Sequence, residues 1–280
     1  MTITRKSESG SLLREEIIRL YEAEPDLQSL PTLVFEGVAR LIDADVVAYA
    51  EFHHGSGDFR ALISVDDDPA ARGQAMAAYA RHMHSHPFWQ NGADFYGDRA
   101  LRESDFFDED TFLALPMVQE TFLRSGARRI IKIVIQHEGY VLDVSGFRVM
   151  GRAAFSDQDR DDLQEYRTHI LRCYRQAQER TLARLTPTDR LRLAFPQITA
   201  RQLEVASWLA QGKSNEDIAT ILNVSIDTVK AHMKALYERI GSDGRLATAI
   251  IAHTIPPFSQ LPPLWKLSAE AWGASSGPSR

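Results

Sequence analysis

The sequence predicts two domains of different class: an α+β domain with a mostly antiparallel sheet flanked by helices, and an all-α domain of four helices. Three observations favour this architecture. The chain of 280 residues exceeds the usual domain length of about 100–200 residues. Short β-branched or aromatic runs alternate with helically spaced stretches in the first two thirds of the chain. Capped helical stretches without any strand signal then fill residues 197–254.

Composition places the chain among ordinary globular proteins, with 44% hydrophobic and 25% charged residues. We expect a cytoplasmic protein without a membrane segment, because no apolar run approaches the roughly 18–20 residues needed to cross a bilayer. The first residues also lack the apolar core of a signal peptide. The single cysteine, Cys173, excludes an internal disulfide and is interpreted as a packing residue on a helix. The net charge of −6 means that any binding to nucleic acid must depend on a local arrangement of cations.

The chain opens with two predicted helices, 11–24 and 31–42, the second of which begins at a proline. Two runs rich in β-branched and aromatic residues, 45–52 and 59–65, flank a glycine-containing turn and predict a hairpin. Residues 70–84 are rich in helix formers. From residue 86 to 110 the periodicity disappears, although aromatic side chains are frequent there, and long loops of this kind are often functional.

The second half of this α+β domain is predicted to contain a helix, a hairpin and a long helix. Residues 111–125 read as a helix interrupted near Pro116. Two strands, 128–136 and 139–149, are joined by a tight turn. Ser156 then opens a helix over residues 157–184.

That long helix carries one apolar stripe, which has two interpretations. The stripe includes Leu163, Ile170 and Cys173 at steps of three and four residues, as expected of a helix that covers a sheet. Its continuation to Leu182 and Leu185 equally suits a dimer seam. Both interpretations remain open from the sequence.

The expected domain boundaries follow from these elements. The α+β domain occupies residues 1–185, and residues 186–196 read as a linker because they lack a clear period. The four-helix domain occupies residues 197–255. A proline-rich tail follows over residues 256–280, and its apolar side chains predict some docking.

Capping residues define a helix-turn-helix inside the second domain. Thr199 with Gln202 forms one capping box, and Ser214 with Asp217 forms another. Asn223 suits a left-handed turn, and the following serine suits the next N-cap. The pattern predicts helices over 215–222 and 225–239, the spacing at which a second helix enters the major groove of DNA.

The predicted recognition helix has two distinct sides at 3.6 residues per turn. Its buried stripe comprises Val229, Met233, Leu236 and Ile240. Lys230, Ala231 and Lys234 lie together on the side expected to face DNA bases. The flanking residues Thr228 and His232 suit phosphate oxygens, and Ser214 and Asn215 offer a phosphate seat at a helix start.

Residues 197–254 resemble the LuxR-type, or GerE-type, DNA-binding domain. The matching positions are Thr199, Arg201, Glu204, Val205, Leu209, Ala210, Gly212, Ser214, Asn215, Ile218, Ala219, Leu222, Val224, Ser225, Thr228, Val229, Lys230, His232, Leu236, Ile240 and Gly241. The resemblance implies a four-helix module that dimerises partly through its last helix, here about 245–254, and binds inverted repeats in double-stranded DNA. It also implies base contacts from Lys230, Ala231 and Lys234. Contact with RNA polymerase is a further expected partnership.

The sequence departs from that family pattern at three neighbouring positions. Ala200 replaces the usual proline, Gln202 the usual glutamate, and Leu203 a residue that is normally polar. We therefore expect Leu203 to be an exposed apolar contact. Acidic residues balance the basic ones in this domain, so a single copy should bind DNA weakly and dimerisation should be required.

The element order of the first domain resembles GAF/PAS-like small-molecule sensor domains and also autoinducer-binding domains. A phosphorylated receiver fits poorly, because the acidic residues 66–68 come too late and Lys132 lies inside a strand. An acyl-homoserine-lactone receptor of the quorum-sensing type uses a spaced Trp, Tyr, Asp and Trp set, whereas this domain has only Trp89. A receptor for another, unidentified small-molecule effector remains, with no cofactor.

The candidate ligand site lies between the sheet and the aromatic loop. Its residues are Tyr49, His86, Phe88, Trp89, Phe95, Tyr96, Phe106, Phe107, Phe112 and Arg129. Closure of the hydrophobic core explains the same aromatic residues equally well.

A metal centre and an enzyme are both weaker interpretations. His82, His84 and His86 would diverge on a helix, so surface histidines are favoured over metal ligands. The chain has no phosphate loop, no GxSxG elbow and no HExxH motif. The sequence therefore predicts a homodimeric, sequence-specific transcription regulator under ligand control. The alternatives are a ligand-independent regulator or adaptor that acts through protein contacts and a quorum-sensing acyl-homoserine-lactone receptor.

Overall fold

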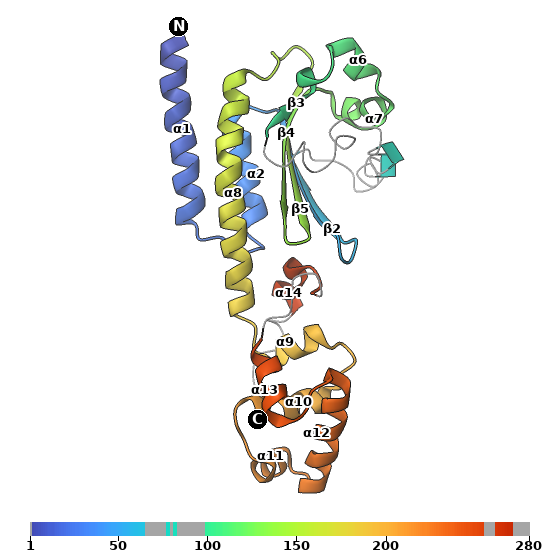
Figure 1. The fold of residues 1–280 in the computed structure, drawn as a ribbon. Helices are drawn as coiled ribbons and strands as arrows, with labels where there is room; N and C mark the ends of the chain where they lie inside the picture. Colours follow the sequence, from blue (N-terminus) through green and yellow to red (C-terminus); the bar gives the residue numbers. More distant parts are fainter. Residues whose placement is uncertain (1, 65–76, 79–80, 83–98, 255–260, 271–280) are drawn as a thin grey trace. The chain divides into compact units, whose positions relative to one another are not determined.

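The computed structural model describes residues 2–64, 77–78, 81–82, 99–254 and 261–270 (Figure 1). The chain divides into two compact units, Met1–Ala177 and Gln178–Arg280. Unit 1 is α+β and unit 2 is all-α, which confirms the predicted fold class. No helix among the described residues is long and apolar enough to cross a membrane.

In its described residues, unit 1 is built on an antiparallel sheet of five strands in the order β2-β1-β5-β4-β3. The strands are β1 (Val46–His53), β2 (Phe59–Ile63), β3 (Leu101–Arg102), β4 (Ala127–His137) and β5 (Tyr140–Val149). Both predicted hairpins are present, and the second turns at Glu138 and Gly139, which both have positive φ. The two-residue β3 was not predicted, because a pairing this short has no periodicity.

Helices cover both faces of this sheet (Figure 1). On one side lie α2 (Leu30–Leu41) and α8 (Asp157–Ala183), and α1 (Thr2–Glu22) packs on α2. On the other side lie α6 (Glu109–Ala114) and α7 (Pro116–Glu120), followed by the 3₁₀ turn η3 (Phe122–Ser125). A further 3₁₀ turn, η2 (Glu103–Asp105), follows β3. We call these two faces the α8 face and the α6 face.

The break predicted near Pro116 separates α6 from α7. Leu115 adopts an extended conformation with ψ 131°, as a residue before proline prefers, and α7 starts at Pro116. Asp108 caps α6 by accepting a hydrogen bond of 2.9 Å from the Thr111 amide. Gly126 ends η3 with φ +76°. The cap at Asp108, the break before Pro116 and the left-handed Gly126 thus set the ends of α6, α7 and η3, which cover the α6 face.

The α8 face is closed by a buried network of hydroxyl and carboxylate groups. The Tyr174 hydroxyl of α8 donates to Glu51 Oε1 at 2.6 Å, and the Tyr49 hydroxyl donates to Glu51 Oε2 at 2.9 Å. Arg60 pairs with the same carboxylate at 2.6 Å. Burial raises the pKa of the Tyr49 hydroxyl, and the nearby Glu51 carboxylate raises it further. Glu51 is thus a buried charge whose partners come from three elements.

The apolar stripe of α8 is already buried within the single chain. Leu163, Ile170 and Cys173 are at most 1% exposed. Leu182 and Leu185, at the far end of the stripe, are also buried. The observed burial favours the sheet-covering interpretation for most of this stripe.

The described residues of unit 2 form helices. They are α9 (Pro187–Ala194), α10 (Ala200–Ala210), α11 (Asn215–Leu222), α12 (Ile226–Ile240), α13 (Arg245–His253) and α14 (Leu264–Glu270). In the described part of the tail, Leu264, Trp265 and Leu267 are buried.

Residues 186–196, predicted from the sequence to be a linker, contain a helix. Thr186 caps α9, with Pro187 in its first turn and Asp189 completing a capping box. Helix α9 packs on α10 and α13, and its Leu191 is 1% exposed.

The expectation that Leu203 is an exposed contact is wrong. Leu203 is 5% exposed and packs in one hydrophobic cluster with Leu191, Leu236 and Ile240. The physical reason is α9, because its Leu191 contributes to that cluster and an apolar residue at position 203 therefore has a partner within the unit.

Candidate DNA interface and candidate ligand site

The helix-turn-helix is formed by α11, a tight turn and α12. The Ser214 hydroxyl accepts a hydrogen bond from the Asp217 amide at 3.1 Å and donates to its carboxylate at 2.8 Å. Asn223 adopts the left-handed conformation with φ +51°, which asparagine tolerates better than most residues. Ser225 then caps α12 by accepting from the Thr228 amide at 3.1 Å. The predicted caps are therefore confirmed.

The predicted buried stripe of α12 anchors this helix in two clusters. Val229 and Met233 pack with Ile218 of α11 and Val205 of α10. Leu236 and Ile240 pack in the second cluster with α9, α10 and α13. Because all four stripe residues are at most 7% exposed, the opposite side of α12 faces solvent.

Lys230, Ala231 and Lys234 are exposed on that outward side. Their positions span one helical turn, so their side chains share one surface of about the size that enters a major groove. The Lys230 ammonium lies 3.6 Å from the Asp227 carboxylate one turn earlier. Both side chains are mostly solvent-exposed, so this pair is weak and the lysine remains available to a stronger acceptor.

The proposed backbone-contacting residues lie beside this surface. His232 and Thr228 are half-buried. The Thr228 hydroxyl is 2.8 Å from the Ser225 hydroxyl, which keeps it at the N-terminal end of α12. A helix N-terminus favours anionic oxygens, so these positions suit phosphate.

The second candidate phosphate-binding position, at the start of α11, already forms hydrogen bonds with side chains of the protein. The Asp217 carboxylate bonds to Ser214, and these hydrogen bonds lower the pKa of Asp217. The Asn215 side chain accepts from Arg245 of α13 at 3.3 Å, and the same guanidinium donates to the Lys213 carbonyl. Sequence reasoning missed this role of Arg245, which ties α13 to the start of α11.

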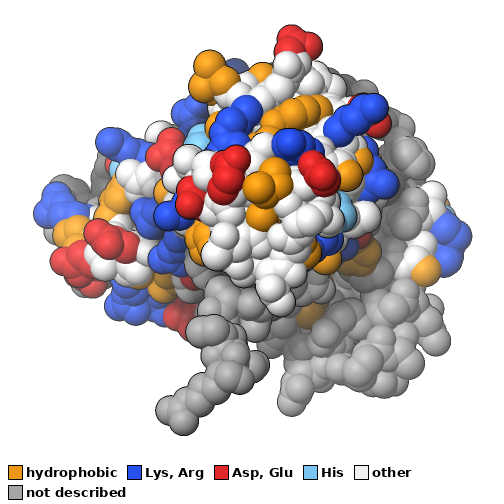
Figure 2. Space-filling view, turned by 90° about the horizontal axis from the view of Figure 1, so that it is seen from below, with side chains coloured by type: hydrophobic (Ala, Val, Ile, Leu, Met, Phe, Trp, Pro, Cys, Tyr) orange, Lys and Arg blue, Asp and Glu red, His pale blue; other side chains and the backbone are white. Residues whose placement is uncertain are grey.

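Charges on the surface of unit 2 are mixed. On the face seen in Figure 2, Lys and Arg side chains are interspersed with Asp and Glu side chains. Helix α13 adds two exposed apolar side chains one turn apart, Leu246 at 74% and Ile250 at 57%. The unit thus combines a small cationic surface with an apolar one.

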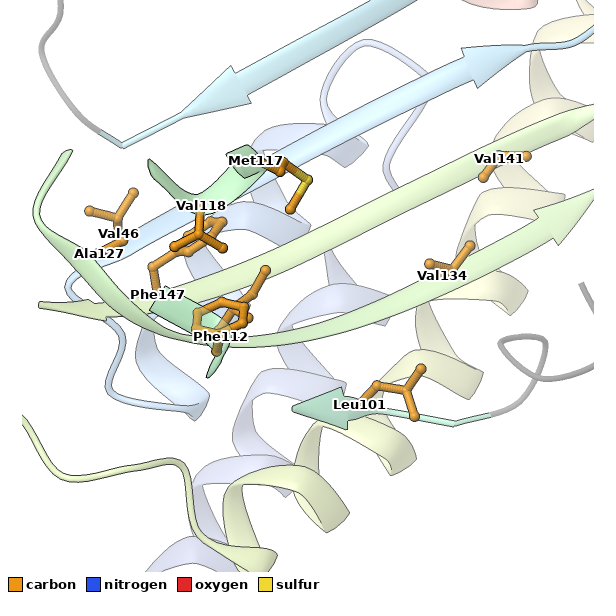
Figure 3. Packing of buried hydrophobic residues seen from close by; sticks show 10 residues of the cluster. Val46, Leu101, Phe112, Met117, Val118, Ala127, Val134, Val141 and Phe147 are labelled. Atoms are coloured by element: carbon orange, nitrogen blue, oxygen red, sulfur yellow. The ribbon is translucent and has the colours of Figure 1, made fainter. Parts of the chain in front are cut away.

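In unit 1, three of the candidate ligand residues lie on the α6 face. Phe112 is 1% exposed, and the rings of Phe106 and Phe107 pack around it, with centroids of neighbouring rings 6.4 to 6.5 Å apart. Figure 3 shows Phe112 gathered with Met117 and Val118 near Phe147 of the sheet. His86, Phe88, Trp89, Phe95 and Tyr96 lie outside the described residues.

Two other candidate residues are separated from that aromatic group. Tyr49 points to the α8 face, where its hydroxyl is engaged by Glu51. Arg129 pairs with Glu109 at 2.5 Å and lies 3.7 Å from Glu103. Burial raises the pKa of Glu103, whose carboxylate accepts a hydrogen bond from the Ile130 amide at 2.8 Å. Arg129 is therefore engaged by two carboxylates.

Sequence reasoning missed a polar group at the centre of the α6 face. Lys132 of β4 and Asp143 and Ser145 of β5 are all buried there. The signal was available in the sequence, because each strand places charged or hydroxyl residues within an otherwise apolar run.

The histidine group considered as a metal site is described only at His82. Its Nε2 atom lies 3.0 Å from the Glu120 carboxylate, whereas His84 and His86 are outside the described residues. Within the described ranges, no three His, Cys, Asp or Glu side chains are grouped suitably for a metal ion.

Residues 196–252 match the family model described as bacterial regulatory proteins, luxR family. The nitrate/nitrite response regulator protein NarP of Escherichia coli (strain K12) is 42% identical over 57 residues, which are 20% of this chain and 26% of that protein. The transcriptional activator protein VanR of Vibrio anguillarum is 38% identical over 64 residues, or 22% and 27% of the two chains. The matches thus span about a quarter of the curated relatives.

The crystal structure of Escherichia coli SdiA is similar over 86% of this chain and 95% of that chain, with a TM-score of 0.44 and 19% identity. The match to the family model lies within unit 2. Its residues 196–252 accordingly form a helix-turn-helix domain of the luxR type.

Proposed function

We propose that the protein is a sequence-specific, DNA-binding transcription regulator that acts in the cytoplasm as a dimer under the control of a small molecule. One observation carries the DNA part of this proposal. The buried stripe of α12 turns Lys230, Ala231 and Lys234 outward together, within a domain of the luxR type.

In the proposed complex, α12 lies in the major groove. Lysine ammonium groups suit guanine O6 and N7, and Ala231 gives clearance or contacts a thymine methyl group. Thr228 and His232 contact phosphates beside the groove. Ser214 and Asn215 present backbone amides at the start of α11 to a second phosphate, although the Asp217 carboxylate bonded to Ser214 weakens this seat.

The mixed surface charge supports binding as a dimer. Nonspecific affinity depends on the number of phosphates that cations neutralise, and acidic residues balance the basic ones within residues 197–254. Leu246 and Ile250 form an exposed apolar surface on α13 that a second copy can cover. A two-fold dimer reads an inverted repeat in double-stranded DNA. Contact of the DNA-bound dimer with RNA polymerase is part of the same proposal.

The small-molecule part of the proposal rests on the α6 face of unit 1. Phe106, Phe107 and Phe112 supply an apolar surface there, and Arg129 lies at its border. Apolar walls with few polar groups are typical of small-molecule sites. The ligand-independent adaptor remains the competing interpretation of unit 1.

Selection from a random DNA pool with the full chain tests the DNA part of the proposal. We expect enrichment of an inverted repeat whose half-sites lie about one or two helical turns apart. Failure to enrich any sequence contradicts sequence-specific binding, and enrichment of single half-sites contradicts the dimer.

The ligand part is tested by thermal unfolding of the full chain in the presence of a metabolite panel. A compound that binds the folded state at saturating concentration raises the unfolding midpoint. Absence of any shift across the panel favours the adaptor.

A further inference from the structure

Helix α10 packs against α12, the helix proposed to read DNA (Figure 1). Val205 of α10 lies in one apolar cluster with Val229, near the start of α12. Leu203 of α10 lies in the other cluster with Ile240, the last residue of α12. Apolar attraction has no preferred direction, whereas a hydrogen bond requires a defined geometry. Hydrogen bonds between these helices therefore add constraints on the orientation of α12 that the apolar packing does not supply.

Arg201, in the first turn of α10, is hydrogen bonded to the end of α11, next to the turn that leads into α12. Its Nη2 atom donates to the Leu222 carbonyl at 3.0 Å. Leu222 is the last residue of α11, where carbonyl groups lack intrahelical partners and a cation is favoured. The Nη1 atom of Arg201 donates to Glu204 Oε2 at 2.5 Å, so two bonds orient the guanidinium. Arg201 thereby connects α10 to the chain just before α12.

Gln202, the next residue of α10, makes a corresponding connection to the other end of α12. Its Oε1 atom accepts a hydrogen bond from Arg239 Nη1 at 2.7 Å and another from the Thr199 amide at 3.0 Å. The same Arg239 nitrogen donates to the Gln197 carbonyl at 2.8 Å, and Gln197 Nε2 donates to the Arg239 carbonyl at 3.2 Å. Because Arg239 is the last residue but one of α12, these bonds attach the last turn of α12 to the start of α10.

The side chains expected to contact bases lie between these two connections. Contacts of this kind require side chains to be held within about 0.5 Å of their productive positions. Gln202 is 4% exposed, so its own side chain is not available to DNA. An effect of Gln202 on DNA reading must therefore act through the orientation of α12.

We propose that Arg201 and Gln202 are positioning residues for DNA reading, which orient α12 so that Lys230 and Lys234 meet base edges. This rests on the proposed function, because it concerns how the same helix distinguishes one sequence from another. Hydrogen bonds to base edges are short and directional, whereas attraction between an ammonium group and a phosphate weakens gradually with distance. A small change in the orientation of α12 therefore reduces affinity for the operator more than affinity for other DNA.

The test measures binding of the full chain to the selected operator and to a scrambled sequence over a range of salt concentrations. Arg201→Met and Gln202→Met each remove the hydrogen bonds and keep an unbranched side chain. We expect each variant to bind the operator at least about tenfold more weakly, because base contacts of α12 are lost. Affinity for the scrambled sequence should change by less than about twofold, and its salt dependence should stay the same, because no phosphate contact is removed.

Two further variants separate positioning from general stability. Gln202→Glu keeps an oxygen that accepts from Arg239 and from the Thr199 amide, so it should retain the wild-type preference for the operator. The matched control is Arg190→Met. Arg190 is half-buried on α9, and its Nη1 atom donates to the carbonyl of His253, the last residue of α13, at 2.6 Å. This control removes the same kind of bond, from an arginine to the last carbonyl of a helix, at a distance from α12 in the sequence, and the operator preference should persist.

All affinities are measured below the unfolding transition of each variant, which thermal melting establishes. Four results overturn the proposal. Wild-type preference in both methionine variants means that these bonds are merely structural. Equal weakening of Arg201→Met on both sequences, with a salt slope reduced by about one, means that Arg201 contacts a phosphate. Loss of preference in Arg190→Met means that the effect follows from stability, and loss in Gln202→Glu means that the bonds accepted by Gln202 are not its cause.

Failure of the proposed function would look different. In that case the wild type itself would bind the operator and the scrambled sequence equally well. If the wild type prefers the operator and both methionine variants do so equally, sequence-specific binding stands and Arg201 and Gln202 do not position α12.

Discussion

Truncation of Leu191 tests whether α9 belongs to the core of the DNA-binding unit. Leu191 is 1% exposed and packs with Leu203, Leu236 and Ile240, so Leu191→Ala leaves a cavity among side chains of several helices. Leucine-to-alanine changes at such sites cost about 2–5 kcal/mol. In a unit of this size, each kcal/mol lowers the unfolding midpoint by about 4–8 °C. We therefore expect the transition of unit 2 to fall by at least about 8 °C.

Calorimetric melting of the full chain measures this effect, with Arg192→Ala as the control. Arg192 is the next residue on α9 and is exposed, so its removal should change stability by at most about 0.5 kcal/mol. Operator affinity at a temperature where both variants are folded should match the wild type, because neither side chain lies on the outward side of α12. A Leu191→Ala midpoint within about 2 °C of the control would refute the assignment of α9 to this core.

Three further predictions address pH dependence, charge and assembly. Burial raises the pKa of Glu103 above its ordinary value, so ionisation of this carboxyl opposes folding once the pH exceeds that value. The unfolding midpoint of Glu103→Gln should therefore rise relative to the wild type as the pH increases above the ordinary pKa of a glutamate carboxyl, and a difference that stays constant with pH would contradict the shift. Asp227→Asn frees Lys230 and removes a charge facing DNA, so operator affinity at low salt should increase about two- to fivefold in gel-shift titrations. Leu246→Asp places a charge on the apolar surface of α13 and should shift sedimentation toward monomer, with at least about tenfold weaker operator binding.

The helix-turn-helix could be predicted closely because its determinants are local. Ser214, Asn223 and Ser225 act on backbone groups within a few residues, so capping chemistry fixes both helix boundaries and the turn. The buried stripe of α12 follows from helical periodicity alone. Local hydrogen bonds and a regular period are the features that a sequence displays directly.

The sheet could be predicted as strands, but its two faces could not be assigned. Residues on both faces of β1 are at least partly buried, so the sequence alternation does not reveal which face of the strand meets which layer of helices. The sequence accordingly groups Tyr49 with the aromatic loop, whereas in the structure its hydroxyl donates to Glu51 on the α8 face. For the same reason, the sequence does not show that Lys132 and Asp143 share one face of the sheet. The register of β4 and β5 shows that they do.

Residues of α9 were misassigned for a different reason. The segment 186–196 has two prolines and is too short for a clear period, so it reads as a linker. Thr186, Pro187 and Asp189 nevertheless form a complete helix start. A capping box with proline in the first turn is the signal that identifies such a helix.

The most direct test of the central claim is operator binding by Lys230→Ala and Lys234→Ala at one fixed salt concentration. Each variant is compared on the selected operator and on a scrambled sequence, with the exposed Lys266→Ala, outside the helix-turn-helix, as the control for loss of one positive charge. If these lysines read bases, each substitution costs about 1–3 kcal/mol on the operator and less on the scrambled sequence, and the control leaves both unchanged. Wild-type affinity and specificity in both variants would contradict the assignment of α12 as the helix that reads DNA.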